Sequence, residues 1–123
     1  MSEMTEVKIR TFKDLRVWQK GVELVKEIYK VTAVYPKTEE YGLSSQMRRA
    51  SVSISANIAE GFRRRSSKEH KQFLNITLGS CAELETLAII SHELKYIDAS
   101  QQNCLTELIN HTCGMLVNLG KKL

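Results

Sequence analysis

Hydrophobic residues recur every three or four positions along most of this 123-residue chain, a spacing that puts them on one face of an α-helix. The stretch from Gly42 to Arg65 shows the pattern most completely. Its apolar and small residues form one stripe: Leu43, Met47, Ala50, Ile54, Ile58 and Gly61. Its polar residues form a second stripe: Gln46, Arg49, Ser53, Asn57, Glu60 and Arg64. Because the residues between the stripes are mostly small, we expect other helices to pack closely around this one.

The polar stripe is unusual for a surface helix, where long Lys and Glu side chains dominate. Ser53 and Asn57 lie among apolar and small residues, so we expect them to be part-buried and hydrogen-bonded. We interpret Gln46, Ser53, Asn57 and Glu60 as structural or interface residues that fix helix register or a subunit contact. Direct contact with a ligand is the less favoured alternative.

The first of four expected helices follows Thr11–Asp14, which has the pattern of a capping box. Its apolar stripe runs from Leu15 to Thr32. Gly21 lies inside the stripe, where it costs about 1 kcal/mol relative to alanine, so a close neighbour is expected there. Tyr35-Pro36 ends the helix, because the residue before proline avoids the helical region.

The second helix is expected to start near Thr38 and the two glutamates that follow it, and to be continuous from about Leu43. Another capping box, Ser66–Glu69, begins a third helix that is apolar on more than one side. Asp98 or Ser100 can cap the fourth helix.

The predicted fold is therefore all-α, an antiparallel up-down-up-down four-helix bundle. Residues 1–11 are expected to be a flexible N-terminal tail and residues 12–123 a single domain. The second and third helices have more apolar surface than a monomer needs to bury, which predicts an oligomer.

Three cysteines without a C-x-x-C pair predict neither a disulfide framework nor a zinc site. Residues 1–11 include two glutamates and no apolar run, so no secretory signal is recognised. We saw no stretch approaching the roughly 18–20 apolar residues of a membrane helix. These features predict a cytoplasmic protein with no membrane partner.

The net charge of +4 is unevenly distributed, since residues 36–71 contain 8 basic and 4 acidic groups. We interpret this excess as candidate phosphate contacts, with a solvated basic surface as the alternative. The candidate nucleic-acid-binding residues are Arg48, Arg49, Arg63, Arg64, Arg65, Lys68 and Lys71.

Enzymatic chemistry finds little support in the sequence. Arg65 and His70 have the R-x-x-x-x-H spacing of a family of small helical ribonucleases, but the rest of that pattern is missing. A ribonuclease that uses these two residues is therefore the third and least favoured functional alternative. The Glu-x-x-His pairs of di-metal bundles and the glycine-rich loops of nucleotide hydrolases are missing too. We predict no enzymatic activity, no metal and no cofactor.

Several motifs together resemble the 23S rRNA intervening-sequence protein family of four-helix bundles. They are Phe12-x-Asp14-Leu15-x-Val17-Trp18-Gln19-Lys20, Tyr35-Pro36-x-x-Glu39, Gly42-Leu43-x-x-Gln46-Met47-Arg48-Arg49-Ala50-x-Val52-Ser53-Ile54-x-Ala56-Asn57-Ile58-Ala59-Glu60-Gly61 and Gly79-Ser80-x-x-Glu83-Leu84-Glu85-Thr86. The resemblance implies a bacterial, cytosolic, non-enzymatic protein of poorly defined function that assembles as a homopentamer. A related branch includes the accessory protein of diversity-generating retroelements, which binds nucleic acid and a reverse transcriptase.

The favoured functional prediction is a non-enzymatic oligomer that binds RNA or DNA through basic residues between the second and third helices. The alternative is a protein-interaction scaffold or adaptor that has no nucleic-acid partner, with a reverse transcriptase or another protein as its ligand. The two differ in what charge reversal at Arg63, Arg64 and Arg65 would do. It should abolish nucleic-acid binding but leave a protein partner bound.

Overall fold

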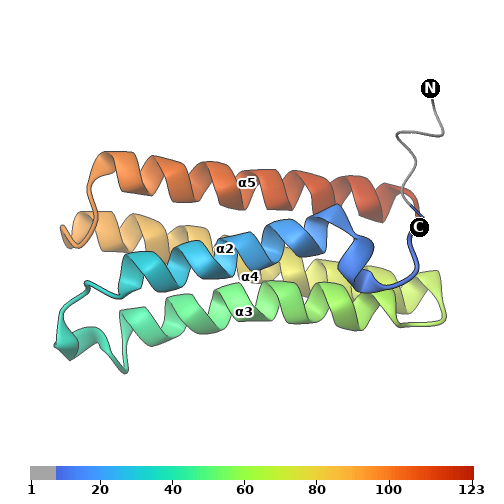
Figure 1. Ribbon diagram of the computed structural model, residues 1–123, viewed down its shortest axis with the longest axis horizontal. Helices are drawn as coiled ribbons and strands as arrows, with labels where there is room; N and C mark the ends of the chain where they lie inside the picture. The colour runs from blue at the N-terminus through green and yellow to red at the C-terminus, as the bar shows by residue number, and fades with distance from the viewer. Residues whose placement is uncertain (1–7) are drawn as a thin grey trace.

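The computed structural model describes residues 8–123 and confirms the all-α four-helix bundle (Figure 1). Four long helices run alternately in opposite directions, and two short 3-10 helices precede the first and second of them. The elements are η1 Phe12–Asp14, α2 Arg16–Thr32, η2 Lys37–Glu39, α3 Leu43–Phe62, α4 Ser67–Glu93 and α5 Ala99–Lys121. Helix α3 packs against α2 and α4, while α5 closes the bundle against the same two helices. The oligomeric state remains a prediction.

The capping box at Thr11 forms, but it does not begin the first long helix as predicted. Thr11 and Asp14 cap the 3-10 helix η1. The Asp14 carboxylate accepts hydrogen bonds from the backbone N–H groups of Arg10 (2.8 Å) and Thr11 (3.1 Å). Leu15 then adopts an extended conformation, so α2 begins only at Arg16. Of the proposed tail, residues 1–7 lie outside the described residues, and residues 8–11 form no helix or strand.

The start of α3 also differs from the prediction. Thr38 does not cap it, because Lys37–Glu39 is a separate 3-10 turn. Gly42 breaks the helical conformation between the two elements, and the continuous helix begins at Leu43 as expected. Glu39 nevertheless stabilises the N-terminus of α3, since its carboxylate accepts a hydrogen bond from the backbone N–H of Leu43 (3.0 Å).

The remaining two helix starts follow the sequence pattern more closely. Ser66 caps α4 by accepting a hydrogen bond from the backbone N–H of Glu69 (3.1 Å). The Glu69 carboxylate binds the Ser66 hydroxyl rather than its backbone, so this is a single cap instead of a reciprocal box. Of the two candidates for α5, Asp98 is the cap, and it forms a complete capping box with Gln101.

The predicted apolar stripe of α3 is buried along its whole length. It meets buried side chains from the other three long helices in one core that includes Leu24, Ile28, Leu84, Leu105 and Leu116. Gly21 of α2 does have the expected close neighbour, because a Cβ atom at this position would lie 3.0 Å from the Ser55 Oγ atom. The stripe pattern alone was therefore sufficient to find the core face.

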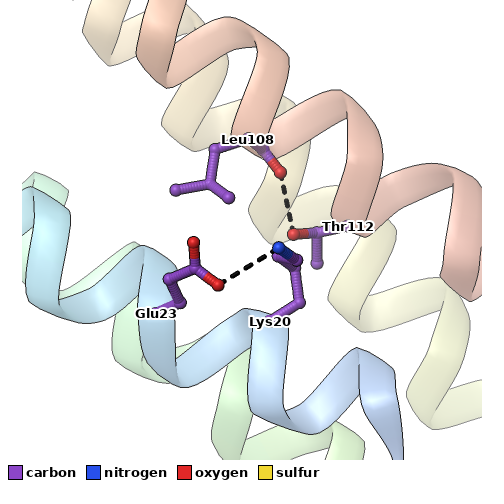
Figure 2. A network of polar contacts seen from close by, with 4 residues as sticks. All are labelled: Lys20, Glu23, Leu108 and Thr112. Carbon is purple, nitrogen blue, oxygen red and sulfur yellow. Dashed lines mark hydrogen bonds and ion pairs between the residues drawn. The ribbon is translucent and has the colours of Figure 1, made fainter.

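Several buried hydroxyl groups donate hydrogen bonds to carbonyl oxygens of their own helices, whereas the buried Ser55 hydroxyl has no partner among the described residues. Figure 2 shows one case, in which the Thr112 hydroxyl donates to the Leu108 carbonyl oxygen at 2.9 Å. Thr77 and Ser91 make the same bond to the residue four positions earlier. The nearby Lys20–Glu23 ion pair, 3.1 Å long, joins two residues of α2 on its surface (Figure 2).

Helix α4 is more apolar than we expected from the sequence. Its mean hydropathy of 1.4 over 18 residues meets the composition of a membrane span, so the expectation that no stretch approached this composition was wrong. Its buried residues, which include Cys81 and Leu84, belong to the core of the bundle, and Glu83 and Glu85 interrupt the apolar run. We therefore assign α4 as a core helix. Its exposed apolar residues are Ile76, Ile89 and Ile90, with Leu94 just after its end.

Candidate nucleic-acid interface

The charged residues of the α3–α4 connection lie at the same end of the bundle as the start of α2 and the end of α5 (Figure 1). We call this region the basic end. Its basic residues are Lys8, Arg10, Lys13, Arg16, Arg63, Arg64, Arg65, Lys68, Lys71, Lys121 and Lys122. Among residues 8–123, three acidic residues accompany these eleven: Asp14, Glu60 and Glu69.

The charge of the molecule is therefore strongly polarised. The basic end has a formal charge of +8, whereas the other described residues contain 7 basic and 9 acidic groups and have a net charge of −2. Six of the eleven basic residues were not among the sequence candidates, because they come from the two ends of the chain. The predicted antiparallel topology would have identified these six residues. It places the start of the first helix and the end of the fourth beside the connection between the second and third.

The three consecutive arginines differ in their surroundings. The Arg63 guanidinium lies over the Phe12 ring, 5.2 Å from its centroid. Arg64 lies over the Phe73 ring at 4.6 Å and also pairs with Glu60 at 3.3 Å. Arg65 is exposed and makes no ion pair or side-chain hydrogen bond within residues 8–123. Two of the three guanidinium groups are thus positioned by aromatic rings, which limits their motion without removing their charge.

Arg48 and Arg49 lie elsewhere. Fifteen residues of helix separate Arg48 from Arg63, which corresponds to about 22 Å at 1.5 Å per residue. Arg48 donates a hydrogen bond from its Nε atom to the Thr32 hydroxyl (2.9 Å) and lies 4.8 Å from the centroid of the Tyr29 ring. Arg49 is exposed beside it. These two arginines do not belong to the basic end, and their contact with nucleic acid remains a separate prediction.

The polar stripe of α3 is partly an interhelical network. Ser53 and Ser80 share a hydrogen bond of 3.1 Å between α3 and α4, and the Asn57 amide donates to the Ser53 hydroxyl at 3.0 Å. The expectation that Ser53 and Asn57 are part-buried and hydrogen-bonded is confirmed. Gln46 and Glu60 are exposed, and their role in an interface remains a prediction.

His70 is a packed side chain rather than an open acid–base group. Its Nε2 atom is inaccessible to solvent and has no hydrogen-bond partner among the described residues. The imidazole lies edge-on to the Phe62 ring, with centroids 6.5 Å apart, and burial lowers the pKa of His70. No group of three possible metal ligands occurs within residues 8–123.

These features define a class of small antiparallel four-helix bundles whose positive charge collects at one end. The chain belongs to the 23S rRNA-intervening sequence protein family, whose pattern matches residues 13–118. The fold is similar to the crystal structure of a protein of unknown function from the S23 ribosomal protein family of Bacteroides thetaiotaomicron. That protein is 26% identical, with a TM-score of 0.77, over 85% of this chain and 98% of the other. Among curated proteins, no match was found. The family resemblance seen in the motifs is confirmed.

Proposed function

We propose that the protein is a non-enzymatic oligomer that binds RNA or DNA through phosphate contacts at its basic end. The observation that supports this function is the charge separation between the +8 end and the net negative remainder. A polyanion is attracted more strongly to this end than to the rest of the molecule, so the field orients the ligand as well as binding it.

The residues at the basic end suit backbone recognition. Lysine and arginine contacts to phosphate position a nucleic acid without reading its sequence. Arg63 is held in place by Phe12, and Arg65 has no partner within the described residues, so both can contact phosphate without first breaking an ion pair. Arg64 has to share its charge with Glu60, and we expect it to contribute less.

The test is the binding of a fluorescent structured RNA and a matched DNA duplex, measured by anisotropy between about 50 and 300 mM salt. We expect affinity to fall steeply with salt, because each phosphate contact releases a counterion. The triple variant Arg63→Glu, Arg64→Glu, Arg65→Glu should lose binding. A matched control with the same change in net charge replaces three exposed lysines remote from the basic end: Lys26, Lys30 and Lys37.

The control separates local contacts from the overall charge of the protein. If both triple variants lose affinity equally, net charge and not the basic end governs binding. If the wild type binds neither probe at about 50 mM salt, the proposed function is wrong.

A protein-interaction scaffold is the second candidate, supported by the exposed apolar residues of α4. Ile76 is 52% exposed and Ile89 is 44% exposed, in a helix that already supplies part of the core. Such residues suit contact with another protein or with further copies of this chain. We propose self-association into the pentamer implied by the family resemblance, which sedimentation equilibrium would test. A partner such as a reverse transcriptase should stay bound to the arginine-reversed variant if the scaffold function is correct.

A further inference from the structure

A cavity of about 630 Å³ opens at the basic end, where the segment before α2 meets the ends of α3 and α5. Its apolar walls come from five side chains: Ile9, Leu15, Phe62, Leu119 and Leu123. Arg16 and Lys122 also line it, so two cations stand beside an apolar interior.

We propose that this cavity receives an unpaired base of the nucleic acid whose phosphates contact the basic end. The inference rests on the proposed function and gives it a ligand class, namely single strands and loops in preference to duplexes. In a duplex each base is paired and stacked, and taking one out costs a few kcal/mol. A strand with unpaired bases does not have that cost.

Two flat rings in the cavity wall suit a planar base. Phe62 and His70 both line the cavity, and their planes are perpendicular, at 90°. A base stacked on the face of one ring would meet the other at its edge, which is a favourable arrangement for aromatic groups. Phe62 is the last residue of α3 and only part-buried, so its ring remains accessible beside the arginines that follow it.

The charges around the cavity fit the backbone of the same strand. Arg16 and Lys122 can contact the phosphates on either side of an inserted base, and Arg63 lies close by in sequence to Phe62. Asp14 also lines the cavity, but its carboxylate already accepts two backbone hydrogen bonds. The volume lies within the range of about 300–1,000 Å³ that holds small-molecule ligands, so a base with its sugar has room.

The experiment compares three labelled probes at one salt concentration: a strand of twelve thymidines, an abasic strand of the same length and phosphate number, and a twelve-base-pair duplex. Base–aromatic stacking contributes about 1–3 kcal/mol per base. We therefore expect the thymidine strand to bind the wild type about 5- to 150-fold more tightly than the abasic strand. The duplex has about twice the phosphates of either strand, so its affinity is compared only between wild type and variants, where a change at the base site should leave it unchanged.

The variant Phe62→Leu removes the aromatic face and keeps an apolar side chain in the cavity wall. We expect it to lose most of the difference between the thymidine and abasic strands, with affinity for the abasic strand unchanged. Phe73→Leu is the matched control, since Phe73 lies at the same end beneath Arg64 but does not line the cavity. The Phe73→Leu variant should still bind the thymidine strand more tightly than the abasic strand.

The outcomes distinguish this inference from the proposed function. Equal, salt-dependent affinity of the wild type for the thymidine and abasic strands overturns the base site but leaves phosphate binding intact. An equal loss of affinity for the duplex and the thymidine strand in Phe62→Leu also overturns it. No binding of any probe contradicts the proposed function itself. Decanoate offers an apolar chain and a carboxylate without a base. Its saturation of the cavity, without any base-dependent affinity, would assign the site to amphipathic anions instead. The wild-type comparison decides the matter even if Phe62→Leu does not fold.

Discussion

The contact between α3 and α4 at Gly61 gives the sharpest prediction about stability. A Cβ atom at this position would lie 2.8 Å from the Phe73 Cβ atom and 3.1 Å from the His70 Cδ2 atom. The Phe73 Cβ atom is attached directly to the backbone of α4, so it cannot rotate away as the end of a flexible side chain could. The change Gly61→Ala therefore has to move the two helices apart.

Two opposing effects determine how much Gly61→Ala changes the free energy of unfolding. Alanine is favoured over glycine inside a helix by about 1 kcal/mol, and by less near a helix end such as this one. Forcing an extra carbon into a well-packed contact costs about 1–3 kcal/mol. We expect the packing cost to exceed the helix preference, with a net loss of about 1 kcal/mol in the free energy of unfolding. For a domain of this size, that corresponds to a fall of about 4 °C in the melting temperature.

The assay is urea unfolding followed by circular dichroism, at a fixed protein concentration because self-association would add to stability. Gly114→Ala is the matched control. Gly114 is an exposed interior position of α5, and a Cβ atom there would meet no other atom within 4 Å. This control should be more stable than the wild type by up to about 1 kcal/mol. If Gly61→Ala is also as stable as the wild type or more so, the close contact has no energetic weight and the reasoning fails.

Two further predictions concern single residues. Burial lowers the pKa of His70 from its ordinary value of 6.5, so below that pH the unfolded chain binds a proton that the folded protein resists. Stability should fall between pH 7.5 and 5.5 and fall less in His70→Leu, whereas equal slopes in urea titrations would contradict the assignment. Asp98→Ala should cost about 1 kcal/mol through loss of the α5 cap. Ser100→Ala should have little effect, and equal melting temperatures for the two variants would show that the capping box does not matter.

Hydrophobic spacing predicted the core face of α3 correctly because burial is a property of the whole helix. Each turn repeats the signal, from Leu43 to Gly61, so an error at one position cannot change the result. A capping box is different, since it is a contact between two residues. Thr11 and Asp14 form theirs around a 3-10 turn, and the extended backbone of Leu15 then redirects the chain. The local pattern does not contain the direction of the helix that follows it.

The candidate site was predictable only where its residues are adjacent in sequence. Arg63, Arg64 and Arg65 were identified from the junction, but Arg16 and Lys122 join them only through the antiparallel arrangement of α2 and α5. Their contribution could have been found by placing the charges on the predicted bundle rather than counting them along the chain. The stacking of Arg63 on Phe12 depends on the η1 turn, whose capping box was interpreted from the sequence as the start of the long helix.

At the basic end, repulsion between cations opposes the close packing of α3 against α4. Eleven cations at one end repel one another, and Asp14, Glu60 and Glu69 offset only part of that repulsion. The tight contact of Gly61 with Phe73 and the neutral, packed imidazole of His70 hold α3 and α4 together where this repulsion is strongest. A bound polyanion would relieve the same repulsion. Ligand binding and folding are then coupled at this end, because an anion that binds only the folded state also stabilises it.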